Sequence, residues 1–189
     1  MNFLAHAYLA GENEGMIVGN LMADAVNRKQ FELLPLHLQK GVLHHRQIDR
    51  YTDSHPLVIE CRSYFFPHIR HYAAVMVDVI FDHYLAKHWQ NYHHLPLITF
   101  EDDTYRKTLT YESHFSEKFR FMFSRMSAHR WLSNYAKYAY LNQTIEHLQH
   151  RTPLFTHATI TNEILQEKYE KLEDHFFDFF EDLSIELKQ

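Results

Sequence analysis

The chain has 189 residues, of which 46% are hydrophobic and 15% aromatic, and its formal net charge is -5 at pH 7. A chain of this size and composition can bury a substantial core, whereas its negative charge offers no overall positive field and argues against general nucleic-acid binding. Only 4 Gly and 5 Pro are present, so we expect long helices rather than many short strands and turns.

The sequence gives no reason to expect export or a membrane span. The opening segment MNFLAHAYLAG is apolar, but it lacks a basic start and contains His6, which disfavours a signal peptide. No run of about 18 apolar residues occurs. Cys61 is the single cysteine, which excludes an internal disulfide and suits a reducing compartment. We therefore expect a cytoplasmic protein that binds neither membrane nor nucleic acid.

The first part of the chain reads as helices separated by glycine, polar and proline breaks. The expected elements are a short helix over Asn2–Ala10 ended by Gly11, a helix over Gly15–Val26, a polar connection over Arg28–Pro35, and a helix over Leu36–Asp53 stopped by Ser54-His55-Pro56.

The remainder continues in the same way, with no repeat and no linker that would divide domains. We expect a helix over Leu57–Phe66 ended by Pro67, one long helix over His68–Tyr92, a loop over His93–Ile98, a helix begun by a capping box at Thr99 and Asp102, a basic helical region over Arg106–Lys137, a break at Arg151–Pro153, and an acidic amphipathic helix over Thr161–Leu187. The prediction is one all-α domain of seven or eight helices over residues 1–189.

Paired acids on two of these helices carry the chemical signal. His45, Asp49 and Asp53 stand four residues apart and therefore share one stripe of a helix, with apolar or small residues beside them. Asp78 and Asp82 have the same spacing in the next long helix. Because an unpaired buried carboxylate is costly, inward acids indicate a cation, a hydrogen-bond network or a raised pKa.

Three further residues are candidates for the same site as these paired acids. His83 follows Asp82 directly, and His6 lies on the apolar side of the first helix, where it is either a core histidine or a ligand. Asp24 stands four residues after Asn20, between two alanines that leave room for something to approach.

Carboxylate and imidazole groups without thiolate suit a hard or borderline divalent cation. Mn²⁺, Fe²⁺, Mg²⁺ and Zn²⁺ would all fit, and the excess of oxygen ligands favours Mn²⁺ or Mg²⁺. Such an ion favours hydrolysis of a phosphate ester. The chain has no GxSxG, Walker loop, CxxC or GxGxxG motif, and it lacks the Glu-x-x-His spacing of di-iron bundles.

Four blocks in order carry a family resemblance. MNFLAH at the start, GNLMAD at Gly19–Asp24, HRQIDRYTDSHP at His45–Pro56 and DVIFDHYLAKHW at Asp78–Trp89 together resemble the acyl-carrier-protein phosphodiesterase family, also called ACP hydrolyases. WLSNY at Trp131–Tyr135 fits its second half. The resemblance implies an all-α protein distantly related to HD-type metal hydrolases, which needs a divalent cation and removes 4'-phosphopantetheine from holo acyl carrier protein.

The resemblance also implies a set of site residues. The family's acidic and histidine signature falls on His6, Asp24, His45, Asp49, Asp53, Asp78, Asp82 and His83. We expect Asp24 to orient or deprotonate the attacking water. Arg46 and Arg50 either steady the phosphoryl oxygens, which a guanidinium matches bidentately, or form surface pairs with Glu or Asp.

Other functions and a docking surface stay open at this point. An HD-like phosphohydrolase acting on a nucleotide or another small phosphodiester would use the same cation, and a non-catalytic binder of carrier protein could keep the fold. The region Arg106–Lys137 holds seven Lys or Arg residues against two acids. It is either an ordinary solvated face or a docking surface for the acidic carrier protein.

Overall fold

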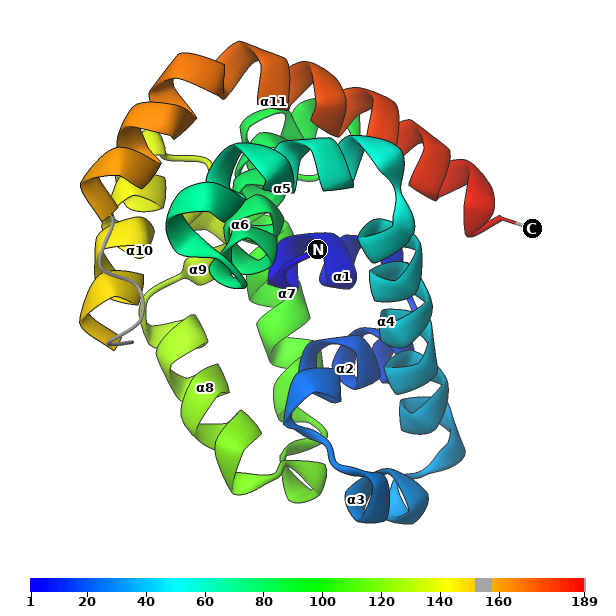
Figure 1. Ribbon diagram of the computed structural model, residues 1–189. Coiled ribbons are helices and arrows are strands. Elements are labelled where there is room, and N and C mark those ends of the chain that lie inside the picture. Colours follow the sequence, from blue (N-terminus) through cyan, green and yellow to red (C-terminus); the bar gives the residue numbers. More distant parts are fainter. Residues whose placement is uncertain (152–157, 189) are drawn as a thin grey trace. The chain divides into compact units, whose positions relative to one another are not determined.

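Every element in the described part of the chain is a helix, as Figure 1 shows. The computed structural model describes the backbone of residues 1–151 and 158–188. It confirms the predicted all-α class. Thr152 and Pro153, which belong to the predicted break, lie outside the described residues.

The chain divides into two units, and each is described by itself. Unit 1 comprises Met1–Asn2, Arg50–Lys87 and Tyr135–Gln189, and unit 2 comprises Phe3–Asp49 and His88–Asn134. Unit 2 holds α1 (Phe3–Leu9), α2 (Glu14–Met22), η1 (Ala23–Ala25), α3 (Arg28–Leu33), most of α4 (Leu36–Ser54), η2 (Trp89–Asn91), α7 (Leu97–Leu109), η3 (Glu112–His114), α8 (Glu117–Ala128) and α9 (Trp131–Asn134). Unit 1 holds the end of α4, α5 (Pro56–Ile69), α6 (Tyr72–Lys87), α10 (Tyr138–Arg151) and α11 (Ala158–Glu186).

Two glycines let the backbones of α2 and α4 touch in unit 2. A Cβ atom added to Gly19 would lie 2.3 Å from the carbonyl oxygen of Leu38 and 2.7 Å from the Cα of Gly41. A Cβ added to Gly41 would lie 2.6 Å from the carbonyl oxygen of Met16. Neither separation is compatible with a side chain, so glycine is required at both positions for this approach.

The buried face of α4 carries both apolar and polar residues. Leu38 and Val42 are fully buried, and His45, one turn further on, is 6% exposed. Asp49 follows after another turn and is partly exposed. The i, i+4 periodicity that fills the core therefore also places an imidazole and a carboxylate along the same stripe.

A buried carboxylate joins α7 to α9. Glu101 accepts hydrogen bonds from the hydroxyl of Tyr105 at 2.9 Å, from Ser133 Oγ at 2.6 Å and from the backbone N–H of Leu132 at 3.0 Å. Arg130, which adopts a positive φ of 46° in the turn before α9, adds an ion pair at 3.2 Å. This complete pairing explains why a fully buried Glu is tolerated.

Unit 1 is built on aromatic packing. α11 lies along α5, as the two ribbons show in Figure 1. Phe65, Phe81, Phe176 and Phe179 are fully buried, and the ring centroids of Phe81 and Phe179 are 5.4 Å apart. The predicted amphipathic helix at the C-terminal end is thus confirmed, with its apolar side in the core.

The described residues form eleven α-helices and three 3₁₀ turns, more than the seven or eight helices predicted. The polar connection predicted over residues 28–35 contains α3. Asn27 begins it with a capping box, since Asn27 Oδ1 accepts from Gln30 N at 3.0 Å and Gln30 Oε1 accepts from Asn27 N at 2.9 Å. These two hydrogen bonds pair four polar groups within the segment itself. They stabilise a helix that is too short to show periodicity in the sequence.

Three other predicted boundaries were wrong. α5 continues through Pro67 and ends at Ile69, where Arg70 turns the chain with a φ of 50°. The long helix predicted over residues 68–92 is therefore broken there, and it breaks again after Lys87. α7 begins after Pro96 rather than at a Thr99 capping box, because the Pro96 carbonyl accepts from Thr99 N and starts the helix earlier.

Among the described residues, no helix combines the length and apolar character needed to cross a membrane.

Gly41→Ala tests the contact between α2 and α4. The added methyl group must push the two backbones apart, so we expect the free energy of unfolding to fall by about 2 kcal/mol or more. Urea unfolding followed by circular dichroism measures it. Lys40→Ala, at the exposed neighbouring position, is the matched control and should change stability little. Equal stability of the two variants would contradict the close approach.

Candidate metal centre

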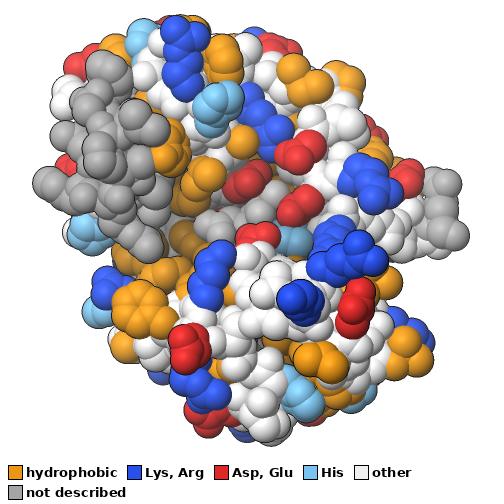
Figure 2. Space-filling view, turned by 60° about the horizontal axis from the view of Figure 1, so that its bottom comes forward, with side chains coloured by type: hydrophobic (Ala, Val, Ile, Leu, Met, Phe, Trp, Pro, Cys, Tyr) orange, Lys and Arg blue, Asp and Glu red, His pale blue; other side chains and the backbone are white. Residues whose placement is uncertain are grey.

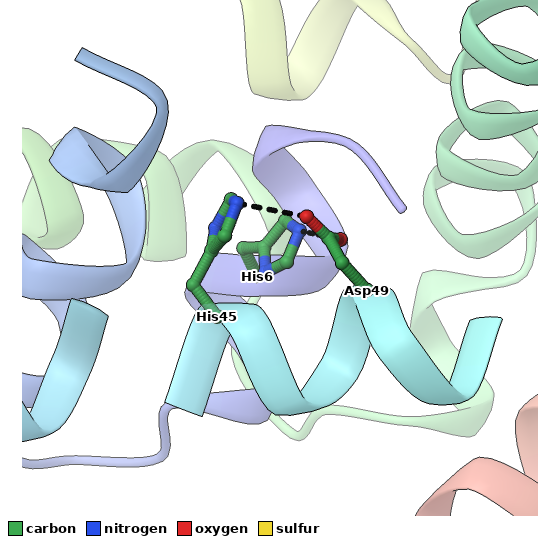
Figure 3. Close-up of side chains that lie close together, drawn as sticks. All are labelled: His6, His45 and Asp49. Carbon is green, nitrogen blue, oxygen red and sulfur yellow. Dashed lines mark hydrogen bonds and ion pairs between the residues drawn. The ribbon is translucent and has the colours of Figure 1, made fainter. Parts of the chain in front are cut away.

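Two histidines and an aspartate converge in unit 2, from α1 and α4 (Figure 3). His6 Nε2 lies 3.1 Å from Asp49 Oδ1, and His45 Nε2 lies 3.0 Å from Asp49 Oδ2. The two imidazole rings are stacked, with centroids 3.8 Å apart and planes 17° from parallel. One nitrogen of each histidine and a carboxylate oxygen fall within 4.8 Å of one another, as they would around one metal ion.

Asp24 brings a second carboxylate to this group. Its Oδ1 lies 3.3 Å from His45 Nε2, and its side chain is 71% exposed. The sequence predicts Asp24 within an α-helix over residues 15–26, but α2 ends at Met22 and the 3₁₀ turn η1 carries Asp24 instead. Four of the eight predicted site residues, His6, Asp24, His45 and Asp49, are thus brought together in unit 2.

The amide of Asn20, on α2, fixes which nitrogen of His6 carries the proton. Asn20 Nδ2 donates to the carbonyl oxygen of Met16 at 3.3 Å and to Nδ1 of His44 at 3.0 Å. The atom 3.1 Å from His6 Nδ1 is therefore the amide oxygen, Asn20 Oδ1. Because an amide oxygen only accepts, His6 Nδ1 donates, and Nε2 of the neutral ring keeps its lone pair.

One of the resulting contacts joins two hydrogen-bond acceptors. The lone pair of His6 Nε2 faces an oxygen of Asp49, with no proton between the two acceptors. His45 has both ring nitrogens buried without a hydrogen-bond partner, although oxygens of Asp24 and Asp49 lie at ion-pair distance from its Nε2. A metal-binding histidine commonly donates its other N–H to a carbonyl oxygen, as His6 does to Asn20. These residues therefore fit a divalent cation.

The electrostatics agree with this arrangement. Burial lowers the pKa of His6 to about 4, so its ring is neutral near pH 7. Burial also acts to lower the pKa of His45, but the carboxylates of Asp24 and Asp49 outweigh it and raise that pKa to about 9. The contact with His45 in turn lowers the pKa of Asp24. Two carboxylates thus face one imidazolium, which leaves a net negative group that attracts a cation.

The other four predicted ligands belong to unit 1 and have protein partners there. Asp53 Oδ1 lies 2.7 Å from Arg62, and Asp78 lies 3.0 Å from the α-amino group of Met1. Asp82, which is fully buried, accepts from the backbone N–H of Asn2 at 3.3 Å. Their role as metal ligands stays a prediction.

His83 is held by tyrosines. Its Nδ1 lies 2.7 Å from the carbonyl oxygen of Tyr135, and its Nε2 lies 2.6 Å from the hydroxyl of Tyr169. Since a carbonyl only accepts, Nδ1 donates and Nε2 accepts from the hydroxyl. Both ring nitrogens are occupied by protein groups, which is the environment of a structural core histidine.

Two residues of the site were missed from sequence. Asn20 was noted only for its spacing from Asp24, and its complete burial on an apolar helix was the available signal. His44 precedes His45 on α4, and its Nδ1 accepts a hydrogen bond from Asn20 Nδ2 at 3.0 Å. It therefore supports His6 through the amide.

The predicted arginines are both exposed. The guanidinium of Arg46 lies over the ring of Phe31, 5.1 Å from its centroid. This stacking accounts for the position of Arg46 and leaves its edge N–H groups in solvent. A role for Arg46 or Arg50 at the phosphate stays a prediction.

Comparisons with known proteins agree over nearly the whole chain. A family model described as acyl carrier protein phosphodiesterase matches residues 1–183. Proteins named acyl carrier protein phosphodiesterase are 31% identical over 181 residues in Yersinia pestis, covering 95% of this chain and 94% of the relative, and 29% identical over 189 residues in Serratia proteamaculans, covering 100% and 98%. No solved structure matches the chain.

The helical fold and the histidine–carboxylate group define an all-α protein with a possible metal site. The chain belongs to the acyl carrier protein phosphodiesterase family, since the family model spans nearly its full length. This confirms the predicted family, the enzyme class of phosphoric diester hydrolase, and acyl carrier protein as the substrate partner. The predicted relation to HD-type hydrolases stays a prediction.

Asn20→Leu tests the orienting role of the amide. The variant keeps the approximate volume but removes the acceptor for His6 Nδ1, so we expect the affinity for Mn²⁺ to fall about 10- to 100-fold. Isothermal titration with MnCl₂ measures it. Gln47→Leu replaces an exposed amide on α4 and should leave the affinity unchanged. If both variants bind Mn²⁺ like the parent, Asn20 does not orient a ligand.

Proposed function

We propose that this protein hydrolyses the phosphodiester that joins 4'-phosphopantetheine to a serine of holo acyl carrier protein, using a divalent cation, with Mn²⁺ first and Mg²⁺ or Fe²⁺ as alternatives. The observation that carries the proposal is the convergence of His6 Nε2, His45 Nε2 and Asp49 in a member of this family. We keep the single domain over residues 1–189, the HD-like relation and the cytoplasmic location as parts of the proposal.

His6, His45 and Asp49 hold the cation in this proposal. The two imidazoles offer neutral nitrogen ligands, and Asn20 keeps His6 in the tautomer whose Nε2 lone pair is available. A divalent cation bound there lowers the pKa of water and offsets negative charge on a phosphoryl oxygen. The mixture of two imidazole nitrogens and a carboxylate oxygen suits Mn²⁺ and Fe²⁺ better than Mg²⁺, which prefers oxygen.

Asp24 is the proposed base. Its carboxylate is mostly exposed, and its lowered pKa keeps it ionised at neutral pH. It accepts a proton from the attacking water as the water oxygen forms a bond to phosphorus. The bond between phosphorus and the serine oxygen breaks, that oxygen takes a proton from solvent, and Asp24 returns its own proton to solvent, so the products are the apo carrier protein and 4'-phosphopantetheine. Arg46 and Arg50 are candidates for steadying the phosphoryl oxygens.

Asp53, Asp78, Asp82 and His83 remain further candidates for metal ligands in this proposal. Each of them has a protein partner within unit 1. Substitution distinguishes the two sets, because loss of a direct ligand removes metal binding as well as turnover.

The deciding experiment incubates the protein with holo acyl carrier protein and MnCl₂ and follows the mass of the carrier. We expect loss of the arm with Mn²⁺ and none with a chelator, together with a lower melting temperature on chelation, because a cation that binds only the folded protein stabilises it. An arm that stays attached with Mn²⁺, Mg²⁺ and Fe²⁺ would contradict the proposed reaction. Hydrolysis of a nucleotide phosphodiester in its place would favour an HD-like phosphohydrolase.

Asp49→Asn tests the centre itself. The amide is nearly isosteric, so the fold should persist while kcat/KM for holo carrier protein falls by about a hundredfold or more and Mn²⁺ binding is lost. Asp174→Asn changes an exposed aspartate on α11 and is the matched control. Turnover that survives in Asp49→Asn would move the cation to other residues.

A further inference from the structure

Two adjoining hollows in unit 2 lead away from Asp24. The first has a volume of about 500 Å³ and is lined by Asp24, Asn27 and Lys118, among others. The second has a volume of about 240 Å³ and is lined by Met22, Leu33 and Phe115, among others. Val26, Gln30 and Ser116 line both. We call the two together the arm groove; it has a polar end at Asp24 and a more apolar end at Leu33.

The polar end combines two carboxylates, Asp24 and Glu117, with one cation, Lys118. In the capping box of α3, the side-chain oxygens of Asn27 and Gln30 each accept a backbone N–H, so their amide NH₂ groups are the parts left to contact a ligand. Ser116 Oγ donates to the carbonyl oxygen of Ala25 at 2.9 Å and accepts from Phe119 N at 3.1 Å. Acceptor oxygens of a ligand would therefore meet Lys118 and the two amides at this end.

Lys118 differs from four of the other six basic residues of its region. Arg106, Lys107, Arg120 and Arg130 each pair with a nearby carboxylate, which supports an ordinary solvated face for most of the basic region. Figure 2 shows such mixing of blue and red side chains on one face of the molecule. Lys118 Nζ instead donates to the backbone carbonyl of Asp24 at 2.8 Å, so the charge stands beside the proposed base without a carboxylate partner among the described residues.

The apolar end exposes hydrophobic surface. Leu33 is 85% exposed at the end of α3, and it faces the groove with buried Met22 and Leu34 and with Phe115. An exposed leucine alone needs no explanation. Here it continues a hollow that begins at the proposed base, which gives one groove with a charged, polar end and a more apolar end.

We propose that the arm groove binds the 4'-phosphopantetheine arm, with the phosphate at Lys118 and the chain running along α3 towards Leu33. This inference rests on the proposed function and names its substrate subsite. The arm starts with a phosphate, continues with a dimethyl group, a hydroxyl and two amides, and ends in a thiol, so its charged end matches the end of the groove that carries Lys118. The carboxylate of Glu117, which also lines the polar end, suits the amide N–H groups.

The first test removes the charge at the polar end. Lys118→Met should weaken the binding of free 4'-phosphopantetheine by about tenfold, because one charge-assisted hydrogen bond is lost. Isothermal titration measures this affinity. Lys118→Arg keeps the charge and should retain most of the affinity. Lys29→Met removes an equivalent exposed charge from α3 outside the groove and should bind like the parent. Equal affinities for Lys118→Met and Lys29→Met overturn the proposal.

A separate measurement distinguishes substrate binding from support of Asp24. Lys118→Met should keep the Mn²⁺ affinity and melting temperature of the parent while kcat/KM for holo carrier protein falls. If Mn²⁺ affinity falls and the affinity for 4'-phosphopantetheine does not, Lys118 only positions η1 and the proposal is wrong.

The second test addresses the apolar end. Leu33→Ser should weaken binding of 4'-phosphopantetheine by about fivefold and leave binding of inorganic phosphate unchanged, because only the arm reaches this end. Leu36→Ser, at a position 67% exposed and outside the groove, is the matched control. The arm binds elsewhere if Leu33→Ser changes the affinities for 4'-phosphopantetheine and inorganic phosphate equally. It also binds elsewhere if the Leu33→Ser and Leu36→Ser variants have the same affinity for 4'-phosphopantetheine.

Failure of the proposed function gives a different result. A parent protein that releases no arm from holo carrier protein contradicts the function, whatever the groove binds. A parent that releases it, with Lys118 and Leu33 variants as active as their controls, contradicts only the groove.

Discussion

The approach of α2 to α4 is the constraint on which the candidate centre depends. The two backbones meet at Gly19 and Gly41, closer than any side chain would allow. Asn20 follows Gly19 directly, and it therefore reaches both His6 on α1 and His44 on α4. Three helices are joined through one amide, and the tautomer of His6 is a consequence of how closely two of them pack. A site held by helices and an amide in this way keeps its geometry without the flexibility of a loop.

The charges of the group follow from the same packing. Helix α4 buries His45 on the stripe that Leu38 and Val42 fill, and the turn after α2 brings Asp24 to it. An imidazole in an apolar interior would ordinarily be neutral. Two carboxylates reverse that preference at His45, while His6, which meets only one, stays neutral. The stacked rings therefore differ in protonation until a cation replaces the proton, and metal binding should release that proton.

The arm groove and the centre share Asp24, which faces His45 on one side and lines the groove on the other. A phosphodiester held at Lys118 would thus present its phosphorus near the proposed base. Recognition of the arm is local in this arrangement. Carboxylates compensate four of the seven basic residues of the region, Arg106, Lys107, Arg120 and Arg130, and salt screens the attraction of the remaining charges for a distant carrier protein.

The sequence by itself determined the helical class, the boundaries of α4, and the stripe of His45 and Asp49, because spacing along one helix depends only on its period. The ordered blocks also determined the family. Tertiary structure decided which residues from different helices meet. It joined His6 and Asp24 to the stripe, revealed the supporting role of Asn20, and surrounded His83 with tyrosines. Contacts between helices depend on backbone separation and on turns such as η1, and a periodic pattern carries no information about either.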